Sequence, residues 1–119
     1  MTRVRGATLK PRLRLVRNGT IVLGPGKADL LECVRALGSL RKAAAGLGMS
    51  YMRAWTLVKT MNDAFASPLV AFARGGARHG GATLTPAGTK VLALYRAMER
   101  ACIRATSSQA TAVRRFLRK

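Results

Sequence analysis

Near the start of the chain, apolar and polar residues alternate as they do in a β-strand. Charged and apolar residues alternate over residues 12–15, and a β-branched run follows over residues 20–23. Asn18 and Gly19 lie between the two runs, and both tolerate the positive φ of a tight type I′ turn. The pattern therefore predicts a β-hairpin over residues 12–23.

After the hairpin, the apolar spacing changes to three and four residues, which is typical of helices. Gly38 and Gly48 interrupt this pattern and are suitable helix ends, because glycine adopts the left-handed conformation without strain. Ser39 and Ser50 follow as N-caps of the next helices. The predicted helices cover residues 27–37, 40–47 and 50–65.

The three helices are expected to pack through apolar faces. In the first helix this face comprises Leu30, Leu31, Val34 and Leu37. In the second it comprises Leu40, Ala43, Ala44 and Leu47. In the third helix the inward side is expected to hold Tyr51, Trp55, Val58 and either Met61 or Asn62, with Trp55 as a core anchor.

The second half of the chain predicts two short strands and a long helix. The strands are expected over residues 69–72 and 82–84, on either side of a glycine-rich tip at residues 74–81. Thr85 as N-cap and Pro86 at the first helical position then predict a helix that reaches about Ala105. Its apolar stripe comprises Val91, Tyr95, Met98, Cys102 and Ala105.

The predicted order is hairpin, three helices, hairpin and long helix. This order defines a mainly helical α+β fold, a winged helix-turn-helix with an N-terminal β-hairpin and a long C-terminal helix. We expect one domain over residues 12–105, preceded by a basic arm over residues 1–11. A basic, frayed tail is expected over residues 106–119.

Charge indicates the kind of partner. Twenty-two Lys and Arg residues stand against four Asp and Glu residues, which gives a net charge of +18 at pH 7. Self-repulsion of this size favours a polyanion partner, of which nucleic acid is the commonest. An anionic membrane or an acidic protein stays open as an alternative. The basic residues are spread along the whole chain, so no single detachable tail carries the charge.

Composition argues against an enzyme, a metal site and a cofactor. Four carboxylates and a single histidine, His79, offer no triad, paired acids or metal cage. Cys33 and Cys102 are far apart in sequence and are expected to be buried thiols. The stretch over residues 24–27 contains part of a P-loop but lacks two of its required residues. No apolar run spans a membrane and no secretory signal is evident, so we expect a cytoplasmic protein.

A short helix, a tight turn and a capped second helix form the pattern of a helix-turn-helix. The second helix is the one expected to enter the major groove, where Arg53 can bind guanine and Thr56 can contact thymine. For Lys59 and Thr60, a solvated helix face is an equally good interpretation. The residues of this helix expected to contact DNA are Ser50, Tyr51, Met52, Arg53, Thr56, Lys59 and Thr60.

Further basic residues are expected to contact the DNA backbone or minor groove. The glycine-rich tip forms a wing that carries cationic and polar side chains, and Arg41 and Lys42 begin the helix before the turn. The wing residues assigned to DNA contact are Arg74, Arg78 and His79. On the last helix, Arg96, Arg100 and Arg104 are spaced four residues apart and either face a polyanion or form a solvated face.

The last helix is long for so small a domain, and it is expected to pair with a second copy in a homodimer that reads two half-sites. The residues assigned to this interface are Val91, Tyr95, Met98 and Cys102.

Taken together, the residues from Leu13 to about Ile103 resemble the N-terminal DNA-binding domain of the molybdate-responsive ModE regulator family. The likeness rests on Gly26-Lys27, Gly38-Ser39, Gly48-Met49-Ser50-Tyr51, Ala54-Trp55, Met61-Asn62, the wing glycines and Leu84-Thr85-Pro86 with Gly88. Parts of this pattern also suit LysR-type regulators, and residues 50–55 decide between the two. The resemblance implies a winged-helix dimer that binds a palindromic operator. In that family molybdate is sensed by a separate pair of small β-barrel domains, so molybdate binding is not expected of these 119 residues.

Three functions remain open at this stage. The first is a sequence-specific transcription regulator, favoured by the helix-turn-helix and the wing. The second is an architectural protein that coats DNA with little base preference, favoured by the charge. The third is a module whose basic surface binds an acidic protein or RNA, and competition by duplex DNA distinguishes it from the other two.

Overall fold

In the computed structural model, which describes residues 3–4, 7–73 and 81–119, Asn18 and Gly19 form the predicted hairpin turn. Their φ angles are 50° and 79°, as a type I′ turn requires. The turn joins β3 (Leu15–Arg17) to β4 (Thr20–Leu23) in an antiparallel pair with an irregularity between Leu15 and Val16. A further short pair, β1 (Arg3–Val4) with β2 (Ala7–Thr8), precedes it.

Three helices follow in the predicted order. They are α1 (Pro25–Leu37), α2 (Leu40–Gly46) and α3 (Tyr51–Ala64), each within two residues of its predicted ends. Gly38 ends α1 with φ 67°, and Gly48 lies between α2 and α3 with φ 68°. Both glycines adopt the left-handed conformation that the sequence predicts.

The wing strands are β5 (Val70–Phe72) and β6 (Ala82–Leu84), which pair antiparallel with Ala71 opposite Thr83. The connection between α1 and α2 extends this small sheet, because Ser39 forms a bridge with Gly81. The Ala82 amide also donates a hydrogen bond to the Gly38 carbonyl at 3.0 Å. The start of the helix-turn-helix is therefore fixed directly to the base of the wing.

The last helix, α4 (Pro86–Arg114), is 29 residues long. Thr85 caps it as predicted, since its hydroxyl accepts a hydrogen bond from the Gly88 amide at 3.0 Å. The helix continues nine residues past Ala105 and takes in most of the segment expected to be a frayed tail. Thr106 lies within this extension, and its hydroxyl donates to the Cys102 carbonyl at 2.7 Å in the preceding turn.

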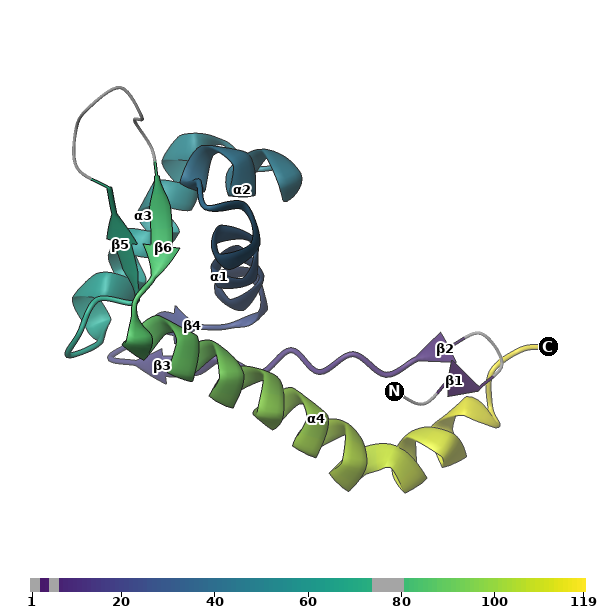
Figure 1. Ribbon diagram of the computed structural model, residues 1–119. Helices are drawn as coiled ribbons and strands as arrows, with labels where there is room; N and C mark the ends of the chain where they lie inside the picture. Colours follow the sequence, from purple (N-terminus) through teal and green to yellow (C-terminus); the bar gives the residue numbers. More distant parts are fainter. Residues whose placement is uncertain (1–2, 5–6, 74–80) are drawn as a thin grey trace.

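Figure 1 shows how these elements are arranged. The helices α1, α2 and α3 and the wing strands form a globular part, and α4 extends away from it. The segment before β3 runs back along α4, so that β1 and β2 lie near the C-terminal end of that helix. The whole molecule measures 57 × 29 × 24 Å.

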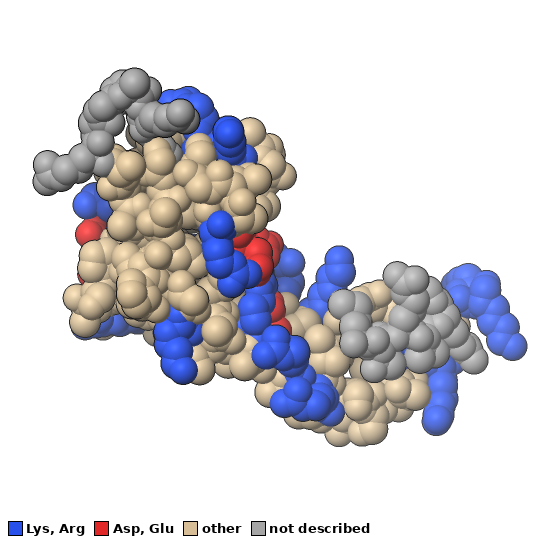
Figure 2. All heavy atoms as spheres, viewed as in Figure 1, with Lys and Arg blue, Asp and Glu red and all other residues tan. Residues whose placement is uncertain are grey.

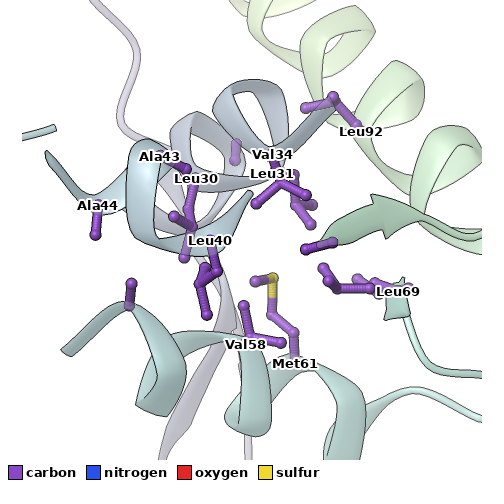
Figure 3. Packing of buried hydrophobic residues seen from close by; sticks show 14 of the residues in the cluster. Leu30, Leu31, Val34, Leu40, Ala43, Ala44, Val58, Met61, Leu69 and Leu92 are labelled. Carbon is purple, nitrogen blue, oxygen red and sulfur yellow. The ribbon is translucent and has the colours of Figure 1, made fainter. Parts of the chain in front are cut away.

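One hydrophobic core joins all four helices and the wing strands (Figure 3). Leu30, Leu31 and Val34 of α1 are fully buried, as predicted. Ala43 and Ala44 of α2 and Ala54 of α3 are also buried, so the two helices of the helix-turn-helix approach each other through small side chains.

Three burial predictions are wrong. Leu37 is 47% exposed, because α1 ends there and the residue lies past the contact with α2. Trp55 is 40% exposed and does not anchor the core. Cys33 and Cys102 are half-buried free thiols, not fully buried ones.

Candidate nucleic-acid interface

The helices α2 and α3 and the turn between them form a helix-turn-helix whose geometry is set by two serine caps. The Ser39 hydroxyl accepts a hydrogen bond from the Lys42 amide, and the Ser50 hydroxyl accepts one from the Arg53 amide, each at 3.1 Å. The Met49 amide donates to the Ala44 carbonyl at 3.0 Å and closes the turn. The start of α3 is therefore rigidly placed.

The exposed and buried sides of α3 are clearly divided. Ala54, Val58 and Met61 face the core. On the opposite side, Met52 is 65% exposed, and Arg53, Thr56 and Lys59 are exposed with it. These four residues are on the outer side that the sequence predicts, and they form the candidate DNA-contacting surface.

Trp55 lies at one border of this surface instead of in the core. A shallow hollow of about 170 Å³ lies between α3 and β5, and Trp55 and Phe72 both line it. Trp55 is 40% exposed and Phe72 is 42% exposed. Consecutive residues are 100° apart on a helix, and Ala54, one position before Trp55, is the residue that is buried in the core.

Lys59 and Thr56 form bonds within the chain, and Thr60 does not lie on the outer side of α3. The ammonium group of Lys59 pairs with Asp63 at 3.1 Å on the exposed side of α3. Thr60 is half-buried and lines a hollow beside the hairpin with Arg17 and Thr20, so it is not on the outer side. Thr56 is exposed, and its hydroxyl donates to the Met52 carbonyl at 2.9 Å.

The residues assigned to the DNA backbone fall into two groups. Arg41 and Lys42 are exposed at the start of α2, and the Arg41 guanidinium lies 4.7 Å from the centre of the Tyr51 ring. This cation–π contact joins α2 to α3 and makes the half-buried Tyr51 a support for Arg41. The assigned wing residues Arg74, Arg78 and His79 lie outside the described residues.

Asn62 has a structural role that the sequence analysis missed. Its side-chain oxygen accepts hydrogen bonds from the amides of Leu69 and Val70 at 2.8 and 3.2 Å, and its amide donates to the Val70 carbonyl at 3.1 Å. The end of α3 is thereby attached to the wing strand β5. The sequence offered one indication of this role, because Asn62 is a polar residue on the side of the helix that was expected to face inward.

Most of the acidic residues gather around a single arginine. Arg96 of α4 pairs with Asp29, Glu32 and Glu99 at 3.0 to 3.1 Å. Burial alone would lower the pKa of Arg96, but its hydrogen bonds to the three carboxylates outweigh this and raise that pKa above the ordinary value. Arg96 is therefore engaged inside the molecule, unlike the exposed Arg100 and Arg104.

Figure 2 shows how the charged side chains are distributed over the surface. Lys and Arg side chains lie along α4 and over the globular part, while Asp and Glu are few and gather mainly between them. Ion pairs engage all four acidic residues of the chain, with Asp63 pairing with Lys59.

The four residues assigned to a dimer interface differ in how far they are exposed to solvent. Tyr95 is buried in the chain's own core, where its hydroxyl donates to the Leu13 carbonyl at 2.8 Å. Burial, and then the nearby Glu99 carboxylate, raise the pKa of Tyr95, so the hydroxyl keeps its proton. Because it is buried within its own chain, Tyr95 is not included in the dimer interface proposed below. Val91 and Cys102 are half-buried, and Met98 is 47% exposed.

The helix-turn-helix with its attached two-stranded wing defines the class of this domain: it is a winged helix-turn-helix. Within residues 3–4, 7–73 and 81–119, no group of three or more His, Cys, Asp or Glu side chains is placed to hold a metal ion. No helix of the described part is long and apolar enough to cross a membrane.

The chain is homologous to the N-terminal region of ModE and to Mop proteins. It is 42% identical over 86 residues to the molybdenum-pterin-binding protein MopB of Rhodobacter capsulatus, and 36% identical over 88 residues to the molybdenum transport protein ModE of Azotobacter vinelandii. These matches cover 72% and 74% of this chain but 32% and 33% of the relatives. The chain thus spans about a third of the length of these relatives.

A third relative is named as a transcription regulator. The DNA-binding transcriptional dual regulator ModE of Escherichia coli K12 is 37% identical over 71 residues, which cover 60% of this chain and 27% of the relative. The homologues are regulators, transport proteins and binding proteins, in agreement with the prediction of a non-enzymatic protein. No protein-family model matches the chain.

Proposed function

We propose that this chain binds duplex DNA sequence-specifically, with α3 in the major groove, and regulates transcription. The observation that carries the proposal is the row of exposed side chains on α3, Met52, Arg53 and Thr56, at the capped start of the helix. A helix about 10–12 Å across fits a groove about 12 Å wide, and the first turns of such a helix reach the base edges.

Each exposed residue of α3 offers a different contact. Arg53 can donate two hydrogen bonds to a guanine, and the Met52 side chain can pack against a thymine methyl group. Thr56 can accept a hydrogen bond from a base, because its own proton is held by the Met52 carbonyl. Lys59 is assigned to the backbone only, since Asp63 already neutralises it. We propose that Arg41 and Lys42, which are exposed at the start of α2, contact phosphates.

We propose that the chain forms a homodimer through the outer face of α4. Leu94 and Met98 lie one helical turn apart and are 52% and 47% exposed. The hairpin strand β3 is held near this helix by the bond from Tyr95 to Leu13, and it exposes Leu15 and Val16. We propose that these side chains pair with a second copy, which would place two α3 helices in successive turns of the major groove, about 34 Å apart.

The proposal is tested by measuring binding to a duplex from the chain's own upstream region and to a scrambled duplex, at physiological salt. Sequence-specific binding is expected to favour the natural duplex by at least about a thousandfold. Equal affinity for both duplexes would contradict the proposal.

One observation favours a second candidate function. The positive charge extends over the globular part and along α4, well beyond α3 (Figure 2). A protein that coats DNA without reading bases would use such a surface. It would show a steep dependence of affinity on salt, with log K falling by about 0.9 for each phosphate contact, and the same affinity for both duplexes.

A further inference from the structure

A basic pocket of about 260 Å³ lies beside α3, between the start of α1 and the hairpin. Four cationic side chains from three separate segments line it: Arg12, Arg14, Lys27 and Arg53. Met49 and Leu57 contribute apolar lining from the turn and from α3. The pocket therefore adjoins the proposed DNA-contacting surface on α3 and shares Arg53 with it.

The positions of these cations are set by specific contacts. The stem of Arg14 passes over Gly24, where an added Cβ would lie 3.4 Å from the Arg14 Cγ. One Arg14 nitrogen donates to the Arg12 carbonyl at 3.3 Å. Lys27 is half-buried in the first turn of α1. Burial, and then the positive charge of Arg53, lower the pKa of Lys27.

Within residues 3–4, 7–73 and 81–119, no acidic side chain lines this pocket. All four carboxylates are engaged elsewhere, three with Arg96 and one with Lys59. None of the ion pairs among the described residues includes a cation of this pocket. The first turn of α1 has no acidic residue, and its N-cap, Gly24, has no side chain to cap the helix. Crowded like charges without a counter-ion favour an anion from outside the chain.

We infer that this pocket binds one phosphate group of the DNA backbone next to the groove that α3 enters. The inference rests on the proposed function and adds a phosphate site to it. Arg14 and Lys27 hold the phosphate by charge, while Arg53, at the border between pocket and groove, stays free to reach a base. A phosphate fixed at this point sets the register of α3 along the duplex without reading sequence.

The test compares four full-length chains: wild type, Arg14→Gln combined with Lys27→Gln, Lys27→Arg, and Lys90→Gln. Lys90 is an exposed lysine on α4 and serves as the matched control for loss of charge. Affinity for the natural and the scrambled duplex is measured between about 50 and 200 mM salt. Circular dichroism confirms that each chain is folded.

The double variant is expected to lose affinity for both duplexes alike, and the slope of log K against log salt should become smaller by about 1. Its loss of affinity between about 50 and 200 mM salt should then be about threefold smaller than that of wild type. Lys27→Arg should keep the wild-type slope, because it keeps the charge.

Two results would overturn the inference. One is a double variant with the same slope as Lys90→Gln. The other is a change in base preference, which would mean that the pocket reads sequence. In either case wild-type binding would still stand and the proposed function with it, whereas a wild-type chain that bound neither duplex would overturn both.

Discussion

Gly88 in the first turn of α4 lies directly against the backbone of Leu69, which precedes the wing strand β5. A Cβ added to Gly88 would lie 2.9 Å from the Leu69 carbonyl carbon and closer still to its oxygen. That oxygen also accepts a hydrogen bond from the Thr85 amide at 3.0 Å. The start of α4 and the base of the wing are thus packed together with no space for a side chain.

Gly88→Ala should therefore destabilise the fold by about 3 kcal/mol, because the backbones of α4 and Leu69 must separate. Chemical denaturation measures the loss. The matched control is Gly46→Ala, since Gly46 is also helical but has nothing within 4 Å of its added Cβ. That change should stabilise the fold by up to about 1 kcal/mol. Equal denaturation midpoints for the two variants would show that the close approach is not present.

Asn62→Ala removes three hydrogen bonds between α3 and the strand β5. The amides of the buried residues Leu69 and Val70 would lose their acceptor, so we expect a loss of about 2–3 kcal/mol in the free energy of unfolding. Asp63→Ala, at the next position, removes only the exposed ion pair with Lys59 and should cost less than about 1 kcal/mol. If Asn62→Ala were as stable as Asp63→Ala, the role assigned to Asn62 would be wrong.

Arg96→Met tests whether Arg96 acts within the fold or on DNA. The change leaves Asp29, Glu32 and Glu99 close together without their shared cation, and we expect a loss of roughly 1–2 kcal/mol in stability. The slope of DNA affinity against salt should stay at the wild-type value. A slope reduced by about 1, with stability unchanged, would instead place Arg96 at a phosphate.

Met98→Glu tests the proposed dimer. Met98 is 47% exposed, so a charge there should leave the protomer folded but should prevent the apolar face of α4 from pairing. Sedimentation equilibrium should give a dimer for wild type and a monomer for the variant. Met52→Glu places the same charge on α3 and should remain dimeric. A Met98→Glu chain with the wild-type mass would exclude this face of α4 as the interface.

The local features of the fold were predictable because they depend on neighbouring residues. The hairpin turn at Asn18-Gly19 and the caps at Ser39, Ser50 and Thr85 are each decided within about four residues of chain, and the structure confirms them. The end of α4 was not predictable in this way. Ser and Thr disfavour helix interiors in general, yet Thr106 here bonds to the turn before it and the helix continues.

The site was predictable only in part, because burial and pairing depend on distant segments. Trp55 and Ala54 are adjacent, and the tertiary packing buries the small residue while the large one is 40% exposed. The contacts of Arg96 join residues 64 and 67 positions apart, which no local pattern indicates. The basic pocket could not be predicted from local sequence either, since Arg14, Lys27 and Arg53 come from three segments that are distant in the chain.

The most direct test of the central claim, that α3 reads the major groove, is the base preference of Arg53→Ala. The preference is measured by selecting bound duplexes from a pool with random positions, for wild type, for Arg53→Ala and for Arg104→Ala, an exposed arginine on α4. We predict that Arg53→Ala loses discrimination at one base pair per half-site by about tenfold or more, while Arg104→Ala keeps the wild-type preference. An Arg53→Ala chain that selects the same sequences as wild type would contradict the orientation of α3 proposed above.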